Sequence, residues 1–144
     1  MLISGLEIFK DHLVINERSD GITKIRVANW SNLKDSHIVD FGEETYAAFT
    51  STNPEFDSDK VRLYFSSMTT PASTYDYDMN GKTLDLMKQQ EVVGDFDSSD
   101  YASERIEVTA RDGAKVPVSI VYKKGLVKNG QAPCLLYTSD AADE

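Results

Sequence analysis

The feature that most constrains the fold of this chain is a series of short runs in which apolar and polar residues alternate, separated by turn-forming residues. Before residue 90 these runs recur at roughly ten-residue spacing, and no long segment with helical periodicity and caps interrupts them. This pattern predicts an all-β sandwich, barrel or propeller, with about nine strands that would form two four-stranded blades and a little more. The expected strands are Leu6–Phe9, His12–Glu17, Ile22–Ala28, His37–Asp40, Thr45–Ser51, Val61–Ser67, Ser73–Asp78 and Thr83–Met87.

Two further alternating runs lie near the end of the sequence, Ser103–Ala110 and Lys115–Lys123. Asp112-Gly113 lies between them and is a turn dipeptide, because glycine takes a positive φ without steric cost. The two runs therefore predict a β-hairpin. The same reasoning predicts turns at Ser19-Asp20-Gly21 and at Asn80-Gly81, whereas the polar, acidic stretch Gln89–Asp100 is typical of a linker.

Charge and composition exclude several classes of function. The net charge of −9 and the pI near 4.6 argue against nucleic acid as a partner, because a phosphate backbone requires a basic surface. No apolar run approaches the roughly 20 residues of a membrane span, and the first residues lack the pattern of a secretory leader. A cytoplasmic location is expected, with the periplasm as the alternative. The single cysteine, Cys134, excludes an internal disulfide framework and a cysteine-based metal cluster.

Several groups of residues invite a functional interpretation that the pattern does not favour. The acids Asp95, Asp97 and Asp100 lack the spacing of an EF-hand loop, so a solvated linker is expected. His12 and His37 without a placed carboxylate are weak evidence for a metal site and are interpreted as ordinary strand or loop histidines.

Three other groups are interpreted in the same way. In Ser73–Asp78, alternation places Tyr75 and Tyr77 on one face and the acids on the other, as in a half-buried strand. Trp30 is expected to pack at a turn. Glu104 and Arg105 are candidates for an interdomain ion pair, which would align domains rather than stabilise them.

The order of several motifs is similar to one known family. S-E-R, A-R-D-G and K-V-P-V-S-I-V-Y-K-K-G resemble the entry to the peptidase domain of the prolyl oligopeptidase family, with the oligopeptidase B branch as the best match. Upstream, S-S-M-T-T-P-A-S-T-Y-D-Y-D followed by K-Q-Q-E-V resembles the last propeller blade of that branch and its exit. The similarity runs from Leu6 to Pro133.

This resemblance implies a two-domain serine peptidase in which a seven-bladed β-propeller covers an α/β-hydrolase domain and admits only short peptides. Catalysis by a Ser-His-Asp triad is implied, with the serine in a G-x-S-x-G motif. Members like oligopeptidase B cleave after Lys or Arg, and others cleave after Pro. The implied partners are short peptides, with neither nucleic acid nor membrane, together with the rest of the propeller and of the hydrolase domain.

On this reading the chain contains the last two propeller blades and the first hairpin of the hydrolase domain. The expected boundaries are 1–94 for the blades, 95–102 for the linker and 103–133 for the start of the peptidase domain. There is no G-x-S-x-G in the sequence, and both histidines fall in the expected propeller. No catalytic, cofactor-binding or metal-ligating residue and no cofactor is therefore expected in this chain.

The last eleven residues suggest a different origin. Cys134–Glu144 can be encoded by a nucleotide string that resembles a transposon-end sequencing adapter read in frame. The family continues after Leu-Leu-Tyr with Gly-Tyr-Gly, whereas Tyr137 is followed by Thr138-Ser139-Asp140. We therefore expect 134–144 to be an artefact, and Tyr137 is not assigned the oxyanion-hole role of the family's second tyrosine.

Two alternatives remain open at the level of the sequence. The parent protein could be a prolyl-specific peptidase of the same family, because the residues that would discriminate lie outside this chain. The chain could also be a small, acidic, non-catalytic β-domain that binds a ligand.

Overall fold

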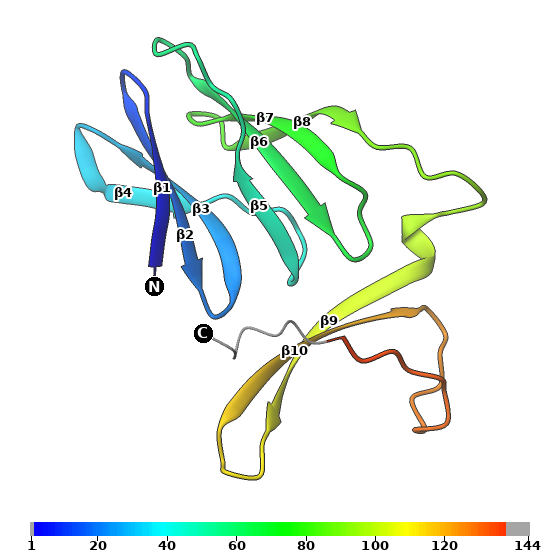
Figure 1. The fold of residues 1–144 in the computed structure, drawn as a ribbon. Coiled ribbons are helices and arrows are strands. Elements are labelled where there is room, and N and C mark those ends of the chain that lie inside the picture. The colour runs from blue at the N-terminus through cyan, green and yellow to red at the C-terminus, as the bar shows by residue number, and fades with distance from the viewer. Residues whose placement is uncertain (1, 138–144) are drawn as a thin grey trace.

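The computed structural model describes residues 2–137, so the expected artefact segment 134–144 lies mostly outside the described residues. Within 2–137 the chain forms ten strands in three antiparallel sheets and one short 3₁₀ helix, η1 (Figure 1). The mostly-β prediction is confirmed. The elements are β1 (Leu2–Ile8), β2 (His12–Ser19), β3 (Ile22–Asn29), β4 (Asn32–Ile38), β5 (Tyr46–Thr50), β6 (Lys60–Ser67), β7 (Ser73–Asp78), β8 (Thr83–Gln89), η1 (Ser98–Asp100), β9 (Tyr101–Thr109) and β10 (Lys115–Lys123).

The strands follow one another in space in the order of the sequence. The first sheet runs β1-β2-β3-β4 and the second runs β5-β6-β7-β8, while β9 and β10 pair only with each other among the described strands. Figure 1 shows the hairpin β9–β10 lying apart from the two larger sheets, beyond the linker that follows β8. The chain is therefore two four-stranded meanders followed by a separate ribbon.

The hydrophobic core lies between the two larger sheets. Alternate residues of β2 and β3 point toward β5, β6 and β7, because neighbouring residues of a strand face opposite sides. Every side chain at the centre of this core is at most 3% exposed. The buried cluster comprises Phe9, Val14, Ile25, Val27, Val39, Ala48, Val61, Leu63, Phe65, Tyr77 and Met79.

Polar side chains of the first sheet satisfy the backbone of β5, the edge strand of the second. The amide of Thr50 donates to Asn16 Oδ1 at 3.1 Å, and Asn16 Nδ2 donates to Thr50 Oγ1 at 2.9 Å. The amide of Ala48 donates to Thr23 Oγ1 at 2.9 Å. An unpaired buried amide costs free energy, so these bonds fix how the two sheets sit against each other.

The predicted turns form, for partly different reasons. Asp20 and Gly21 both have positive φ, 55° and 74°, as a two-residue hairpin turn of type I′ requires. At Asn80-Gly81 the loop between β7 and β8 spans four residues, and the left-handed position is Lys82. Gly81 suits this position because a Cβ would lie 3.2 Å from the carboxyl carbon of Asp78, a tight contact that the Asp78 side chain would have to relieve.

Some strand boundaries differ from prediction. The strand expected at His37–Asp40 is β4, which begins at Asn32 because its backbone pairs with β3 although its side chains are mostly polar and exposed. Gln89 belongs to β8 rather than to the linker, and its Nε2 donates to Ser73 Oγ at 3.0 Å. Eight strands, rather than about nine, precede residue 90.

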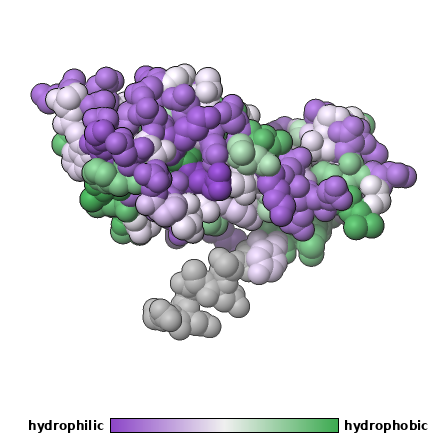
Figure 2. Space-filling view, turned by 90° about the horizontal axis from the view of Figure 1, so that it is seen from above, coloured by the Kyte–Doolittle hydropathy of each residue, from purple (hydrophilic) through white to green (hydrophobic). Residues whose placement is uncertain are grey.

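Both outward faces of the pair of sheets are open to solvent. On the outward face of the first sheet, Leu6 and Ile8 are 57% and 60% exposed on the edge strand, and the same face carries the ion pair between Arg26 and Glu17. Figure 2 shows apolar side chains reaching the surface in patches between hydrophilic ones. The outward face of the second sheet carries ion pairs and is described below.

Candidate functional site

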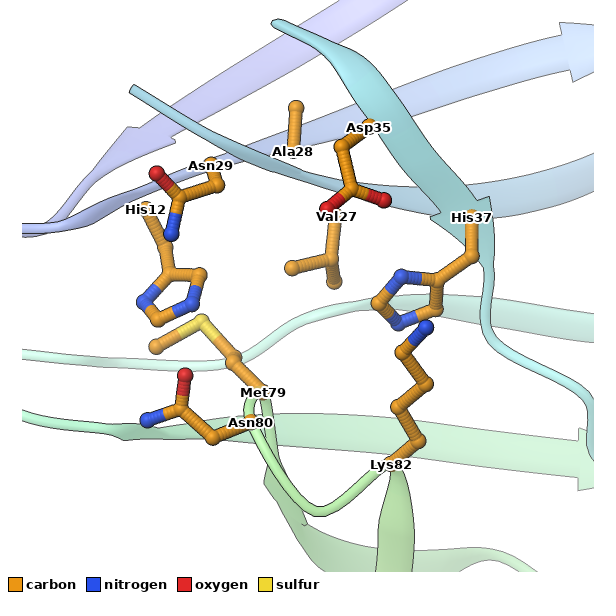
Figure 3. A pocket seen from close by; sticks show the side chains of 9 residues that line it. All are labelled: His12, Val27, Ala28, Asn29, Asp35, His37, Met79, Asn80 and Lys82. Atoms are coloured by element: carbon orange, nitrogen blue, oxygen red, sulfur yellow. The ribbon is translucent and has the colours of Figure 1, made fainter. Parts of the chain in front are cut away.

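The two histidines of the sequence line one pocket at the joint between the sheets (Figure 3). His12 begins β2 and His37 lies near the end of β4, while the turn after β7 closes the pocket from the second sheet. The pocket has a volume of about 120 Å³. Sequence reasoning placed both histidines on strands correctly but had no means of bringing them together. The lining residues are His12, Val27, Ala28, Asn29, Asp35, His37, Met79, Asn80 and Lys82.

The two imidazoles differ in their hydrogen bonding. His37 Nε2 lies 2.7 Å from the Tyr77 hydroxyl, a contact that joins β4 to β7 across the two sheets. His12 is only 4% exposed, and its Nδ1 is buried without a hydrogen-bond partner in the described part of the chain. Buried polar atoms are rarely left unpaired, so this nitrogen is unusual, and it faces the protein interior rather than the open pocket.

The charge environment of the pocket acts on His37. Burial lowers the pKa of His37, the nearby Lys82 ammonium and His12 lower it further, and Asp35 opposes them. Burial of a histidine disfavours its charged form, and a neighbouring cation does the same. These surroundings therefore favour the uncharged form of the His37 imidazole.

Acidification is expected to weaken the joint between the sheets. Because the pKa of His37 is lowered in the folded state, the unfolded chain binds more protons as the pH falls through 6.5 toward the folded value, and stability is lost across that window. Urea midpoints measured between about pH 7 and pH 5 should fall, and they should fall less in His37→Gln. If the urea midpoint fell equally with pH in both proteins, the pH dependence could not be assigned to His37.

The residues in the pocket do not form a metal centre. Within residues 2–137, no group of three or more His, Cys, Asp or Glu side chains is placed to hold a metal ion. The acids of the linker do not converge either. Asp97 accepts a hydrogen bond from the Ser99 amide at 2.8 Å at the start of η1, and Asp100 lies 3.8 Å from Lys123 Nζ.

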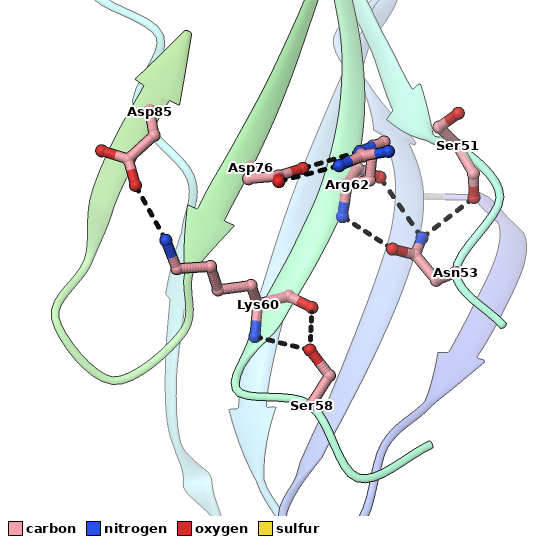
Figure 4. Close-up of polar contacts among 7 residues, drawn as sticks. All are labelled: Ser51, Asn53, Ser58, Lys60, Arg62, Asp76 and Asp85. Carbon is pink, nitrogen blue, oxygen red and sulfur yellow. Dashed lines mark hydrogen bonds and ion pairs between the residues drawn. The ribbon is translucent and has the colours of Figure 1, made fainter. Parts of the chain in front are cut away.

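The outward face of the second sheet carries a ladder of ion pairs (Figure 4). Arg62 donates to both carboxylate oxygens of Asp76, at 2.7 and 2.9 Å, and this contact holds the pKa of Asp76 below its usual value. Lys60 Nζ lies 3.0 Å from Asp85. The predicted alternation is confirmed, because Asp76 points outward while Tyr75 packs against the core and Tyr77 lies within it. These pairs tie β6, β7 and β8 together.

Glu104 and Arg105 do not pair with each other. Glu104 accepts from Lys128 Nζ at 2.7 Å and from the Tyr122 hydroxyl, contacts that lie within the hairpin and the loop after it. The Arg105 guanidinium instead donates to the backbone carbonyl of Asp20, in the turn of the first sheet. The expectation of an interdomain ion pair is therefore wrong, because the partner of Arg105 is a carbonyl group.

A cleft of about 320 Å³ lies beside this contact, between the two sheets and the hairpin. Gly21 and Tyr46 line it from the sheets, and Arg105 and Ser119 line it from β9 and β10.

Trp30, expected to pack at a turn, donates its indole N–H to the Phe9 carbonyl at 2.9 Å. In the part of the chain that the structure describes, no helix is long and apolar enough to cross a membrane.

Comparison with known proteins identifies the origin of this arrangement. Residues 1–90 match the family model described as prolyl oligopeptidase, N-terminal β-propeller domain. The chain is 37% identical over 138 residues to dipeptidyl aminopeptidase BI of Pseudoxanthomonas mexicana, covering 95% of this chain and 19% of that protein. It is 30% identical over 129 residues to protease 2 of Moraxella lacunata, covering 90% and 18%.

A solved structure is similar over nearly the same span. The chain aligns with oligopeptidase B of Trypanosoma brucei with a TM-score of 0.76 and 30% sequence identity, covering 88% of this chain and 19% of that one. This chain thus spans about a fifth of the length of the relatives it matches. Because the propeller model matches more than half of its residues, the chain belongs to the prolyl oligopeptidase family, and its four-stranded sheets are blades of that β-propeller.

Proposed function

We propose that this chain is part of a serine oligopeptidase that hydrolyses short peptides after Lys or Arg, and that the catalytic triad lies outside residues 1–144. The observation that supports this most is the order of two blades, linker and hairpin, which aligns with oligopeptidase B over 88% of the chain. The similarity to a protein named protease 2 supports peptide-bond hydrolysis.

The proposed division of the chain follows its sheets. Residues 1–94 are the C-terminal blades, 95–102 the interdomain linker and 103–133 the start of the α/β-hydrolase domain. The match of the propeller model to residues 1–90 supports the first boundary. The pairing of β9 and β10 only with each other among the described strands supports the last. Residues 134–144 remain proposed as an adapter-derived artefact.

The remainder of the propeller is the proposed partner of the open blade faces. The outward face of the first sheet exposes Leu6 and Ile8, and a blade packed on it would remove this apolar surface from water. Each blade of a propeller is covered by its neighbours, so an isolated pair leaves two faces uncovered. The 144-residue chain alone is expected to be only marginally stable.

One other assignment is compatible with the fold, a prolyl-specific peptidase of the same family. The alternative of a small non-catalytic β-domain that binds a ligand is wrong, because residues 1–90 match the propeller domain of this peptidase family. Similarity to a dipeptidyl aminopeptidase adds a third cleavage mode to compare. A cytoplasmic location is proposed for the parent protein.

The test is an activity assay on the parent protein, encoded by the reading frame at the source locus. It should hydrolyse Lys- and Arg-amide substrates in preference to Pro-amides and should be blocked by reagents that modify an active-site serine. The 144-residue chain should be inactive with every substrate, since it has no G-x-S-x-G motif. Hydrolysis by the 144-residue chain, or a parent protein without peptidase activity, would contradict the proposal.

A further inference from the structure

We propose that the histidine pocket between the two blades is a binding site for a small oxyanion, a carboxylate or a tetrahedral anion such as sulfate, held by Lys82 and the two imidazoles. This site does not depend on the proposed function. Its lining comes from both blades, with His12, Asp35 and His37 on the first and Asn80 and Lys82 on the second.

His12 is the first reason to infer a ligand. Its side chain is buried among residues of the core, yet the imidazole makes no hydrogen bond with any described residue, and its Nδ1 is shut off from solvent. A neutral imidazole carries one donor and one acceptor, and a buried one normally has a partner. The open pocket does not reach Nδ1, but the ring lines the pocket and no described residue bonds its Nε2, so a bound group would give that second nitrogen a partner.

The placement of Lys82 is the second reason. This lysine has a φ of 57°, a conformation that non-glycine residues seldom adopt and that clusters at binding and switch sites. Asp78 builds the turn that holds it, since the Asp78 carboxylate accepts from the amides of Asn80 and Gly81 at 2.9 and 2.6 Å. Figure 3 shows the Lys82 side chain extending toward His37.

The Lys82 ammonium has no ion pair or hydrogen bond within residues 2–137, although the chain as a whole is acidic. It is therefore a cation directed at the pocket and left without a protein anion bonded to it.

The balance of charge favours an anion once His37 is protonated. Among the residues that the structure describes, Asp35 is the one acid that lines the pocket, and it faces Lys82 and the two imidazoles, with the Tyr77 hydroxyl on His37 Nε2. When His37 is protonated, its imidazolium and the Lys82 ammonium face one carboxylate in a confined space, and an oxyanion would offset the excess. Each protonated imidazole offers N–H donors, so binding should strengthen as the pH falls.

The experiment uses the fact that the 144-residue chain contains only two histidines. Their imidazole Cε1–H signals are assigned in the NMR spectrum with His12→Gln and His37→Gln, and each is titrated in chloride, sulfate or acetate at equal ionic strength. Sulfate or acetate should raise the pKa of His37 by on the order of one unit relative to chloride. By reciprocity, the anion should bind about tenfold more tightly to the protonated pocket.

Two lysine variants separate a built site from general charge effects. Lys82→Gln should abolish the anion-dependent shift, whereas Lys88→Gln, which removes an exposed lysine from β8, should leave it unchanged. A response to acetate alone identifies a carboxylate ligand, and a response to sulfate alone identifies a tetrahedral anion. The proposal is overturned if neither anion differs from chloride, if Lys82→Gln responds like the parent chain, or if both histidines titrate as free imidazoles.

Discussion

Replacing Phe65 by alanine is expected to remove most of the free energy that stabilises the folded chain. Phe65 is 2% exposed at the centre of the joint between the blades. Its ring stacks on Phe41 at 4.7 Å between centroids and contacts Tyr46 and Tyr75 at 5.6 and 6.1 Å. Truncating a buried phenylalanine costs about 3–5 kcal/mol, which is most of the free energy of unfolding of a marginal domain. Urea denaturation followed by circular dichroism measures the loss.

Phe49→Ala is the matched control for this substitution. Phe49 lies on the outward face of the second sheet, is 48% exposed and stacks on Tyr64 at 4.6 Å. Losing one exposed aromatic pair should cost about 1 kcal/mol. If both variants lost the same stability, the core could not lie between the two sheets as described.

Removing Arg26 is expected to have the second largest effect on stability. Its Nη2 and Nε donate to the two carboxylate oxygens of Glu17 at 2.9 and 3.1 Å, and Nη1 reaches Ser36 Oγ at 3.4 Å. The Glu17 side chain is only 4% exposed. Arg26→Ala would leave this carboxylate buried without a partner, at a cost of about 3–5 kcal/mol.

A double variant isolates the cause of that loss. Changing Glu17 and Arg26 together to methionine removes both charges and keeps much of the volume, so most of the stability should return. Arg62→Ala breaks a pair in which the arginine is 48% exposed and should cost far less. A double variant as unstable as Arg26→Ala would show that lost packing, rather than a stranded charge, is responsible.

The strands that could be predicted are those whose two faces meet different surroundings. In β7, Tyr75 and Tyr77 face the core and Asp76 faces Arg62, so alternation is plain in the sequence. The first residues of β4 are exposed and mostly polar on an outermost strand, and only backbone pairing with β3 makes them a strand. Periodicity carries no information about such a segment.

The pocket could not be predicted because it depends on how two sheets pack. His12 and His37 lie 25 residues apart, and Lys82 comes from the other sheet, so no spacing rule links them. The hydrogen bond between His37 and Tyr77 joins residues 40 positions apart. The one available signal was the Asn80-Gly81 turn, which predicted a tight turn but not that Lys82 would take the left-handed conformation.

The contact between the hairpin and the first blade could not be predicted from the sequence either. Charge pairing suggested Glu104 with Arg105, but neighbouring residues of a strand point to opposite faces. Glu104 lies at register with Ile120 and pairs with Lys128, whereas Arg105 extends to the Asp20 carbonyl. A backbone acceptor leaves no trace in the sequence, so this partner became visible only in three dimensions.

The most direct test of the central account is to read the source locus past residue 133. We predict that the reading frame continues from the Leu-Leu-Tyr region into Gly-Tyr-Gly and then encodes G-x-S-x-G, followed by the aspartate and histidine of a catalytic triad. A frame that ends directly after Glu144, with none of these motifs, would contradict the account.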